Sequence, residues 1–426
     1  MRKTDLVVAN CHQLITCAGR VPKTKRELKD VGLIEKAWIA SYQGRITFIG
    51  QESEFKKEVI LTEESITIDA TGMTCLPGFV DAHNHLPFAG TREDEFVLRL
   101  QGLTYQEIAS RGMGILTTVR ATREASKEDL VSLCLSRLDQ MLLYGTTTSE
   151  AKSGYGLNKE DEIKQLEVIK ELNSIHPIDL VPTFLGAHDI PPEYKGNKKK
   201  YIDFLIREVM PEIKKNNLAE FFDAFCEEGV YSVKETAKLI SAAKKFGLKI
   251  KLHADEFSSL GGTELAVAEN AVSADHLIYI SEEGIKKIAR SKTAAIILPV
   301  VPFFLMLNKV PPVREMINQG VTIALATDFN PGSSMTESML FALQMAVFKL
   351  KMEIEEAINA ATINAAYALD RHSRVGSLEI GKKMDLIIAN IPNYIHLIYH
   401  LGINPIKYVV KNGQIVARNG RIVRKE

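Results

Sequence analysis

The stretch PGFVDAHNH, residues 77–85, ends an apolar, strand-like run with two histidines. Three later stretches share this design, because in each an apolar run gives way to a loop at a residue that can bind a metal. They are LKIKLHADE (248–256), AVSADHL (271–277) and VTIALATD (321–328), and the side chains concerned are His83, His85, His253, His276 and Asp328. In a parallel β/α barrel the carboxyl ends of the strands meet at one rim, where such enzymes carry out their chemistry. The sequence therefore predicts a barrel with a metal-dependent hydrolytic site.

The central part of the chain alternates between strand-like and helix-like segments. Eight runs, most of them apolar on nearly every residue, are expected to be parallel strands covered on both faces. They are 79–83, 146–151, 179–186, 220–226, 249–254, 271–276, 294–298 and 322–327, and helical patterns lie between them, for example at 161–173, 233–246, 282–291 and 336–350. Repeated strand–helix order favours right-handed crossovers. We therefore predict an α/β fold, a (β/α)₈ TIM-like barrel, over residues 77–376.

Both ends of the chain are rich in strand signals. Residues 1–76 carry β-branched runs separated by glycine-centred turns, with one weak helical pattern near residues 24–30. Residues 377–426 contain the pairs Asn412-Gly413 and Asn419-Gly420, which are strong hairpin signals. We expect these two segments, 1–76 and 377–426, to form one small β-sandwich domain.

The composition is that of an ordinary globular protein of 426 residues, 46% hydrophobic and 25% charged. The 53 basic and 53 acidic residues cancel, and the lysine run KGNKKK (195–200) is expected to be a solvated segment, so we expect no nucleic-acid partner. Five widely spaced cysteines without a CxxC pair argue against disulfides or a thiolate zinc site and favour the reducing cytoplasm. No apolar run is long enough to span a membrane or to form a signal peptide, so no membrane partner is expected.

The four stretches suggest a specific set of metal ligands. His83 and His85 are two apart on a strand end, so both side chains point into the barrel mouth. With His253 and Asp328 they would give three nitrogens and one carboxylate, a set that suits zinc or iron. Simpler explanations exist, since the histidines could be structural and Asp328 could cap a helix. His276 would either ligate the metal or orient the attacking water, and we favour the second role.

The longer motifs carry a family resemblance. PGFVDAHNH, LHADE, ADHL and ATDFNPGS resemble the amidohydrolase superfamily. Within it, the segments KSGYGL, FLGAHDIPPEY, FCEEGVYS and LHADEFSSLGG resemble the imidazolonepropionase family of histidine degradation. One departure is Asn84, which stands between the two histidines where the family pattern leads us to expect threonine. Because this side chain points away from the site, the expectation of a metal centre is unaffected.

The resemblance implies a reaction, a cofactor and a set of site residues. The enzyme would be a cytoplasmic homodimer that hydrolyses the cyclic amide of a small molecule, 4-imidazolone-5-propanoate, to N-formimidoyl-L-glutamate. One divalent metal, Zn²⁺ or Fe, would be held by His83, His85, His253 and Asp328, with Asp328, His276 and Glu256 in catalytic roles. The substrate would be contacted by Arg92, Tyr105, Tyr155, His188, Glu256, Asn330, Gly332 and Ser333.

Several of these residues also have structural explanations. Arg92 lies in the mixed-charge run TREDEF and fits a surface ion pair, while Tyr155 fits a loop tip and His188 a turn. Lys152 follows the second strand, and some amidohydrolases bridge two metals with a modified lysine. The fourth strand lacks a lysine, so we expect one metal. Asp81 is expected to hold a metal ligand from below.

Two other functions remain open at this point. A guanine-type aminohydrolase (deaminase) would share the barrel and the HADE motif but would need no arginine for a substrate carboxylate. A non-catalytic amidohydrolase-like scaffold would share the barrel alone. Such scaffolds are expected to have lost metal ligands, whereas all four are present in this sequence.

Overall fold

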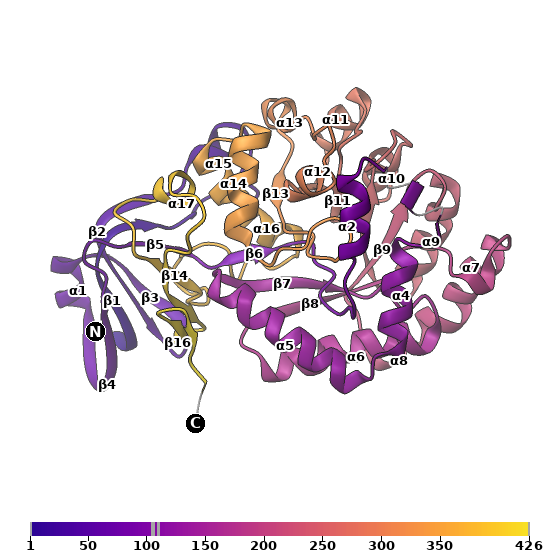
Figure 1. The fold of residues 1–426 in the computed structure, drawn as a ribbon. Helices are drawn as coiled ribbons and strands as arrows, with labels where there is room; N and C mark the ends of the chain where they lie inside the picture. The colour runs from indigo at the N-terminus through magenta and orange to yellow at the C-terminus, as the bar shows by residue number, and fades with distance from the viewer. Residues whose placement is uncertain (1, 104–106, 109–110, 425–426) are drawn as a thin grey trace.

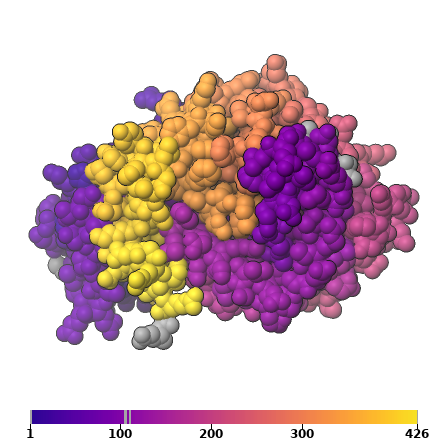
Figure 2. Space-filling model, in the orientation of Figure 1, coloured from indigo at the N-terminus to yellow at the C-terminus, as the bar shows by residue number. Residues whose placement is uncertain are grey.

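The protein consists of a barrel and a smaller sheet domain (Figure 1). The computed structural model describes residues 2–103, 107–108 and 111–424. Both ends of the described chain lie in the sheet domain, and the space-filling view shows the C-terminal segment packed beside the N-terminal one (Figure 2). The expectation that both termini build one sheet-rich domain is therefore confirmed.

The barrel is built from eight strands of the described chain, paired in parallel and in sequence order. They are β6 (Phe79–Asp81), β7 (Thr146–Lys152), β8 (Asp179–Ala187), β9 (Phe221–Cys226), β10 (Lys249–Ala254), β11 (Ser273–His276), β12 (Ala294–Ile297) and β13 (Ile323–Leu325). These are the eight predicted strands, with small differences at their ends. Nearly every strand residue is buried, because helices cover the outside and side chains fill the inside.

The barrel closes just beyond the ends of β6 and β13. The backbone N–H of Asp328 donates to the carbonyl oxygen of His83 at 3.0 Å, and that of His85 donates to the carbonyl oxygen of Phe329 at 3.2 Å. These bonds join the first and last strand ends of the sheet. Closure therefore brings two predicted ligands from residues 83–85 beside a third from residue 328.

Helices surround the barrel strands on the outside (Figure 1). The predicted helices correspond to α6, α9, α11 and α14, and a capping box at Ser232 and Glu235 fixes the start of α9. None of the helices in the described chain is both long and apolar enough to cross a membrane. The helices are α2 (Glu93–Leu100), α4 (Ile115–Glu124), α5 (Lys127–Leu143), α6 (Lys159–Ile175), α7 (Lys198–Phe204), α8 (Met210–Asn216), α9 (Val233–Lys245), α10 (Gly262–Ala268), α11 (Glu282–Ile288), α12 (Val300–Phe304), α13 (Val313–Gln319), α14 (Met339–Leu350), α15 (Ile354–Ala360) and α16 (Ile363–Ala368).

The sheet domain contains nine strands of the described chain in one hydrogen-bonded sheet. They are β1 (Arg2–Ile15), β2 (Leu33–Tyr42), β3 (Arg45–Gln51), β4 (Val59–Asp69), β5 (Thr74–Pro77), β14 (Leu386–Ala389), β15 (Ile406–Lys411), β16 (Gln414–Arg418) and β17 (Arg421–Ile422). The N-terminal strand β5 pairs with the C-terminal strand β14, which joins the two ends of the chain. Both predicted hairpins form, and Asn412, Gly413, Asn419 and Gly420 all have the positive φ that two-residue turns of this kind need.

Apolar side chains cover both faces of this sheet, as expected for a β-sandwich. One cluster includes Leu6, Ile39 and Leu386, and the other includes Val7 and Phe48. The second cluster is completed by α1 (Glu52–Glu58), and the weak helical pattern near residue 24 is a short 3₁₀ helix, Lys25–Lys29. The predicted β-sandwich domain is therefore confirmed.

Candidate active site

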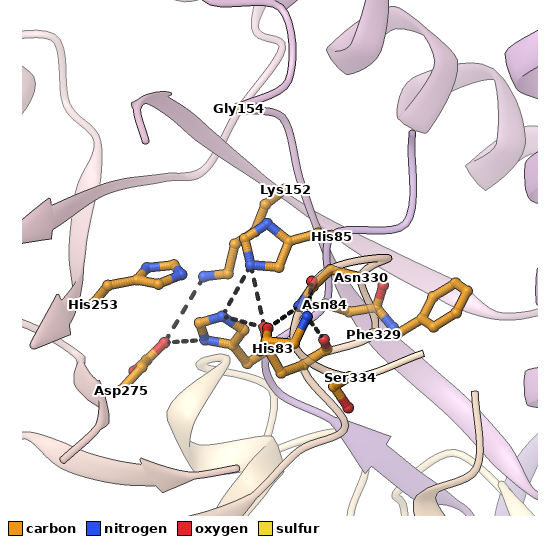
Figure 3. A network of polar contacts seen from close by, with 12 residues as sticks. His83, Asn84, His85, Lys152, Gly154, His253, Asp275, Phe329, Asn330 and Ser334 are labelled. Atoms are coloured by element: carbon orange, nitrogen blue, oxygen red, sulfur yellow. Dashed lines mark hydrogen bonds and ion pairs between the residues drawn. The ribbon is translucent and has the colours of Figure 1, made fainter. Parts of the chain in front are cut away.

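The predicted metal ligands converge at the carboxyl ends of the barrel strands, and Figure 3 shows three of them, His83, His85 and His253. The Nε2 atoms of His83 and His85 lie 3.2 Å apart, and the Oδ1 atom of Asp328 lies 3.3 Å from each of them. A tetrahedral metal with bonds of about 2.0–2.1 Å separates its ligand atoms by about 3.3 Å. These three atoms therefore have the spacing that a common metal ion requires.

Two further imidazoles complete the cluster. The ring of His253 lies 4.5 Å from that of His83 and 5.4 Å from that of His85, measured between centroids. His276 lies 5.0 Å from His253, and these two together with His83 offer nitrogens within 4.8 Å of one another. The geometry thus brings together all four predicted ligands and leaves His276 close enough to bind either the metal or a water.

The electrostatics of the cluster suit a metal cation. Burial lowers the pKa of His83 and of His85 well below the usual histidine value, and it lowers the pKa of His276 to about 3. The imidazoles of His83, His85 and His276 are therefore neutral and keep a lone pair for a metal. The Oδ1 atom of Asp328 is buried and has no hydrogen-bond partner among the described residues. A buried carboxylate oxygen beside neutral nitrogens fits a divalent ion that would compensate its charge.

The backbone is unusual at two of these residues. His276 has a φ of 79° and Asp328 has a φ of 54°, both in the left-handed region that L-residues rarely adopt. Such conformations cost about 1–3 kcal/mol each and persist where the surrounding structure imposes them. Both residues lie at the ends of barrel strands, so the conformation turns their side chains toward the shared centre.

Two buried carboxylates hold the ligand histidines from behind. Asp275 Oδ2 lies 2.6 Å from His83 Nδ1, and Asp223 Oδ2 lies 2.9 Å from His253 Nδ1. Each contact fixes the ring so that Nε2 is the nitrogen left for a metal. The sequence analysis did not identify these two residues, although acids inside the apolar runs FFDAF and AVSADHL were a visible signal.

Asp81 contacts the predicted ligand His83 through the backbone of that residue and not through its imidazole. This carboxylate accepts hydrogen bonds from Thr327 N at 3.0 Å, from Thr327 Oγ1 at 2.6 Å and from Asn84 Nδ2 at 2.9 Å. It therefore joins β6 to the end of β13 and does not hold a ligand imidazole. Asn84 points to this contact and away from the histidines, as expected.

The cluster opens into a pocket lined by most of the predicted substrate residues. Apolar walls come from Ile115, Phe225 and Phe257, which the sequence analysis did not identify. Tyr105 lies outside the described residues. The remaining lining residues are His85, Arg92, Tyr155, His188, His253, Glu256, His276, Asp328, Asn330, Gly332 and Ser333.

Arg92 is a pocket residue and not a surface residue. It is 6% exposed, and its Nη2 atom lies 2.6 Å from Glu95 Oε2. A Cβ atom on Gly332 would lie 2.0 Å from Arg92 Nη1, so the guanidinium packs directly against this glycine. Glu95 in turn accepts a hydrogen bond from Gly114 N at 2.8 Å. The arginine is thus held in one orientation at the pocket wall.

The loop after β13 is ordered by its own hydrogen bonds. Asn330 Oδ1 accepts from Gly332 N at 2.8 Å and from Ser333 N at 2.9 Å, while Asn330 Nδ2 donates to Asp328 O at 2.7 Å. Ser333 Oγ donates to Asp328 Oδ2 at 3.0 Å. The loop therefore connects the metal ligand to the pocket wall.

Tyr155 and His188 form one side of the pocket. Their rings lie 5.2 Å apart, and the ring of His188 stacks on that of His85 at 5.1 Å. His188 Nδ1 lies 3.0 Å from Gly154 O, and burial keeps this imidazole neutral by lowering its pKa well below the usual value. Nδ1 is therefore the protonated nitrogen and Nε2 carries the lone pair.

Glu256 lies opposite, close to His276. Its Oε1 atom is 3.5 Å from His276 Nδ1. Burial raises the pKa of Glu256 well above its usual value, and the charges of Asp328 and Glu227 act in the same direction. Glu227 also accepts hydrogen bonds from the backbone N–H of Glu256 and Phe257, at 3.1 and 2.9 Å. Its surroundings thus favour the protonated form of the Glu256 carboxyl group.

Comparison with known proteins identifies the family. The amidohydrolase family model matches residues 74–416. A protein from Treponema denticola named imidazolonepropionase is 52% identical over 368 residues, which cover 86% of this chain and 89% of that protein. Another with this name, from Geobacillus kaustophilus, is 46% identical and covers 98% and 99% of the two chains. The chain belongs to the imidazolonepropionase family of amidohydrolases.

Membership of the imidazolonepropionase family confirms the prediction of an amidohydrolase barrel and of a hydrolase that acts on cyclic amides. A solved structure of guanine deaminase from Escherichia coli has a TM-score of 0.70 at 15% identity and covers 97% of this chain and 99% of that one. That likeness shows the shared fold alone. The family and the His/Asp cluster together indicate a divalent metal.

Proposed function

We propose that this imidazolonepropionase-family chain hydrolyses 4-imidazolone-5-propanoate to N-formimidoyl-L-glutamate at one divalent metal, Zn²⁺ or Fe. The observation that carries the proposal is the pairing, in one pocket, of a metal-type cluster with a buried arginine. The ligand atoms of His83, His85 and Asp328 lie within 3.3 Å of one another, and Arg92 lines the same pocket. The cluster suits hydrolysis, and the arginine suits a substrate that carries a carboxylate.

The ligands proposed for the metal are His83, His85, His253 and Asp328. A divalent metal held by these residues would lower the pKa of a bound water toward neutrality and would polarise a carbonyl group. Asp328 accepts the proton of that water as its oxygen attacks the carbonyl carbon. His276 is neutral and 3.5 Å from Glu256, and we assign it the role of orienting the water.

Glu256 supplies the proton that the leaving nitrogen needs. Cleavage of the C–N bond leaves an amine-like nitrogen, which must be protonated as the ring opens. Because burial raises the pKa of Glu256, its protonated form is favoured and suits the role of proton donor. Burial raises the pKa of Asp328 as well, but the hydrogen bond from Ser333 opposes this shift and a bound divalent cation would favour the carboxylate form. We therefore assign Asp328 as the base and Glu256 as the acid.

The substrate is oriented by the opposite wall of the pocket. Arg92 presents a planar guanidinium, which can bind a propionate carboxylate with two hydrogen bonds. Tyr155 and His188 contact the ring region, and the segment that carries Asn330, Gly332 and Ser333 closes the other side. Tyr105, outside the described residues, is proposed as an additional contact near the carboxylate.

A single metal is proposed because the remaining acidic set is already paired with lysines. His83, Glu150 and Asp275 also lie within metal-binding distance of one another. However, Glu150 Oε2 lies 2.9 Å from Lys152 Nζ and 2.7 Å from Lys251 Nζ. The ammonium groups occupy the position of a second cation. The ion pairs also raise the pKa of Lys152 despite its burial, so this lysine stays protonated and does not suit a bridging role.

We also propose that the protein is a homodimer in the cytoplasm. Sedimentation of the purified chain tests whether it is a dimer.

The reaction itself is tested by incubating the protein with 4-imidazolone-5-propanoate and, in parallel, with guanine. The proposal expects N-formimidoyl-L-glutamate from the first and no ammonia from the second. Ammonia release from guanine without ring opening of the imidazolone would favour the deaminase, and inactivity of the metal-loaded protein on both would favour a scaffold.

A further inference from the structure

A chain of buried charged residues lies beneath the metal cluster, inside the barrel (Figure 3). Its members come from four strands of the barrel, and each is fully buried: Glu150 and Lys152 on β7, Asp223 on β9, Lys251 on β10 and Asp275 on β11. Residues two apart on a strand face the same side, so Lys251 lies below His253 on β10. Neither lysine is proposed above to bind the substrate or the metal.

Lys152 connects to the ligand His253 through one carboxylate. Its Nζ atom lies 2.6 Å from Asp223 Oδ2 and 2.9 Å from Glu150 Oε2. The same Asp223 oxygen lies 2.9 Å from His253 Nδ1, and Asp223 Oδ1 accepts from the backbone N–H of His253 at 3.1 Å. The lysine thus fixes the carboxylate that fixes both the ring and the backbone of this ligand.

Lys251 connects to the ligand His83 differently, through the backbone before that residue and through a longer ion pair. Its Nζ atom donates to the carbonyl oxygen of Ala82, the residue before His83, at 2.6 Å and to Glu150 Oε2 at 2.7 Å. It also lies 3.8 Å from Asp275 Oδ2, the oxygen that contacts His83 Nδ1 at 2.6 Å. Glu150 joins the two lysines, and its other oxygen accepts from Thr183 Oγ1 at 2.5 Å.

We propose that Lys152 and Lys251 are positioning residues of the metal centre: they hold Asp223 and Asp275, and through them His253 and His83, in the geometry that binds the ion. The proposal rests on the proposed metal centre. Its physical basis is that a buried carboxylate keeps a fixed orientation only when its oxygens are paired. Residues of this kind typically change metal affinity by about 10- to 100-fold when they are altered.

The sheet domain contains a matched buried lysine that has no link to the cluster. Lys411 Nζ lies 2.8 Å from Asp179 Oδ2 and 2.7 Å from Asp385 Oδ2, and the lysine is 2% exposed. Like Lys152, it lies between two carboxylates, one of which belongs to a barrel strand. Neither carboxylate touches a ligand histidine. A change at Lys411 therefore reports the general cost of breaking a buried ion pair.

The experiment measures the dissociation constant of Zn²⁺ by competition with a chromophoric chelator, with no substrate present. Lys152→Gln, Asp223→Asn and the double variant are compared with the unmodified chain, and Lys411→Gln is the control. We expect each barrel variant to raise the constant by about 10- to 100-fold, and the double variant to raise it no further than the larger single effect. Lys411→Gln is expected to lower the melting temperature without changing the constant.

Three results would overturn the proposal: Lys152→Gln with unchanged zinc affinity, fully additive losses in the double variant, or an equal loss in Lys411→Gln. If Lys152→Gln does not fold, it is replaced by the double variant Lys152→Gln with Glu150→Gln, which removes one charge of each sign. It should still bind zinc at least tenfold more weakly, and unchanged affinity would mean that Lys152 only neutralises Glu150. Because zinc binding is measured without turnover, an inactive protein with the expected affinities would contradict the proposed reaction alone.

Discussion

Ser333 Oγ donates a hydrogen bond to Asp328 Oδ2 at 3.0 Å. This bond engages one carboxylate oxygen and leaves Oδ1 facing the imidazoles, 3.3 Å from His83 Nε2 and from His85 Nε2. The two oxygens of one residue therefore have different partners. Oδ1 is available to the metal, and Oδ2 is held by the loop that forms the substrate pocket.

Asp328→Asn is expected to lower kcat by at least about 10²- to 10⁴-fold, because an amide cannot accept the proton of the attacking water. Zinc content is measured alongside, since the same residue is a proposed ligand. Ser333→Ala is the milder companion, as it removes one hydrogen bond to the carboxylate and should lower kcat by about tenfold. Near-full activity of Asp328→Asn would remove this residue from the base role.

Arg92→Ala is expected to raise KM for the imidazolone by about 10- to 100-fold, which corresponds to about 1.5–3 kcal/mol for hydrogen bonds to a charged group. Metal content should not change. Arg92→Lys keeps the charge beside the buried Glu95 but loses the planar pair of donors, so its KM should rise less. The melting temperature of each variant shows whether Glu95 has been destabilised. An unmoved KM in a folded Arg92→Ala protein would show that the carboxylate binds elsewhere.

Gly332→Ala tests the position of the arginine without removing it. A Cβ at this residue would lie 2.0 Å from Arg92 Nη1, so the guanidinium must shift, whereas the metal ligands are untouched. We expect a higher KM with little change in zinc content or melting temperature, because the far end of a flexible side chain can move at low cost. Steady-state kinetics at saturating zinc measures this, and wild-type KM would contradict the assigned contact.

Glu256→Gln is expected to lower kcat by about 10²- to 10⁴-fold and to change the pH profile. The pKa of Glu256 is raised by burial, so the acid form that donates the proton is present below this raised pKa and is lost above it. Activity of the unmodified enzyme should therefore fall on the basic side of the profile. The residual activity of Glu256→Gln should lack this fall, and an identical basic limb in both proteins would assign it to another group.

The strands and the convergence of the candidate ligands could be predicted because both depend on local pattern. Apolar runs mark buried parallel strands, and a ligand at the end of such a run is placed at the rim by the barrel itself. His83, His253 and Asp328 were identified in this way. The Asn412-Gly413 turn was equally readable, since its conformation depends on two adjacent residues.

The partners of the ligands could not be predicted, because pairing across strands depends on register and closure. Asp223 and Asp275 were visible as acids in apolar runs, but nothing in the sequence linked them to particular histidines. Asp81 was assigned to a ligand because it shares a face with His83, and it does contact the backbone of His83, but its bonds to Thr327 depend on the closure of the barrel. From the sequence alone, Arg92 fitted a surface ion pair as well as a substrate contact. The structure places its helix beside the loop that carries Gly332.

The central claim, hydrolysis of the imidazolone at a single metal ion, is tested most directly by titrating metal-free protein with Zn²⁺ while following formation of N-formimidoyl-L-glutamate. The account predicts no product without metal and a rate that rises linearly and stops rising at one equivalent of zinc per chain. Turnover by rigorously metal-free protein, or a rate that levels off only at two equivalents, would contradict it.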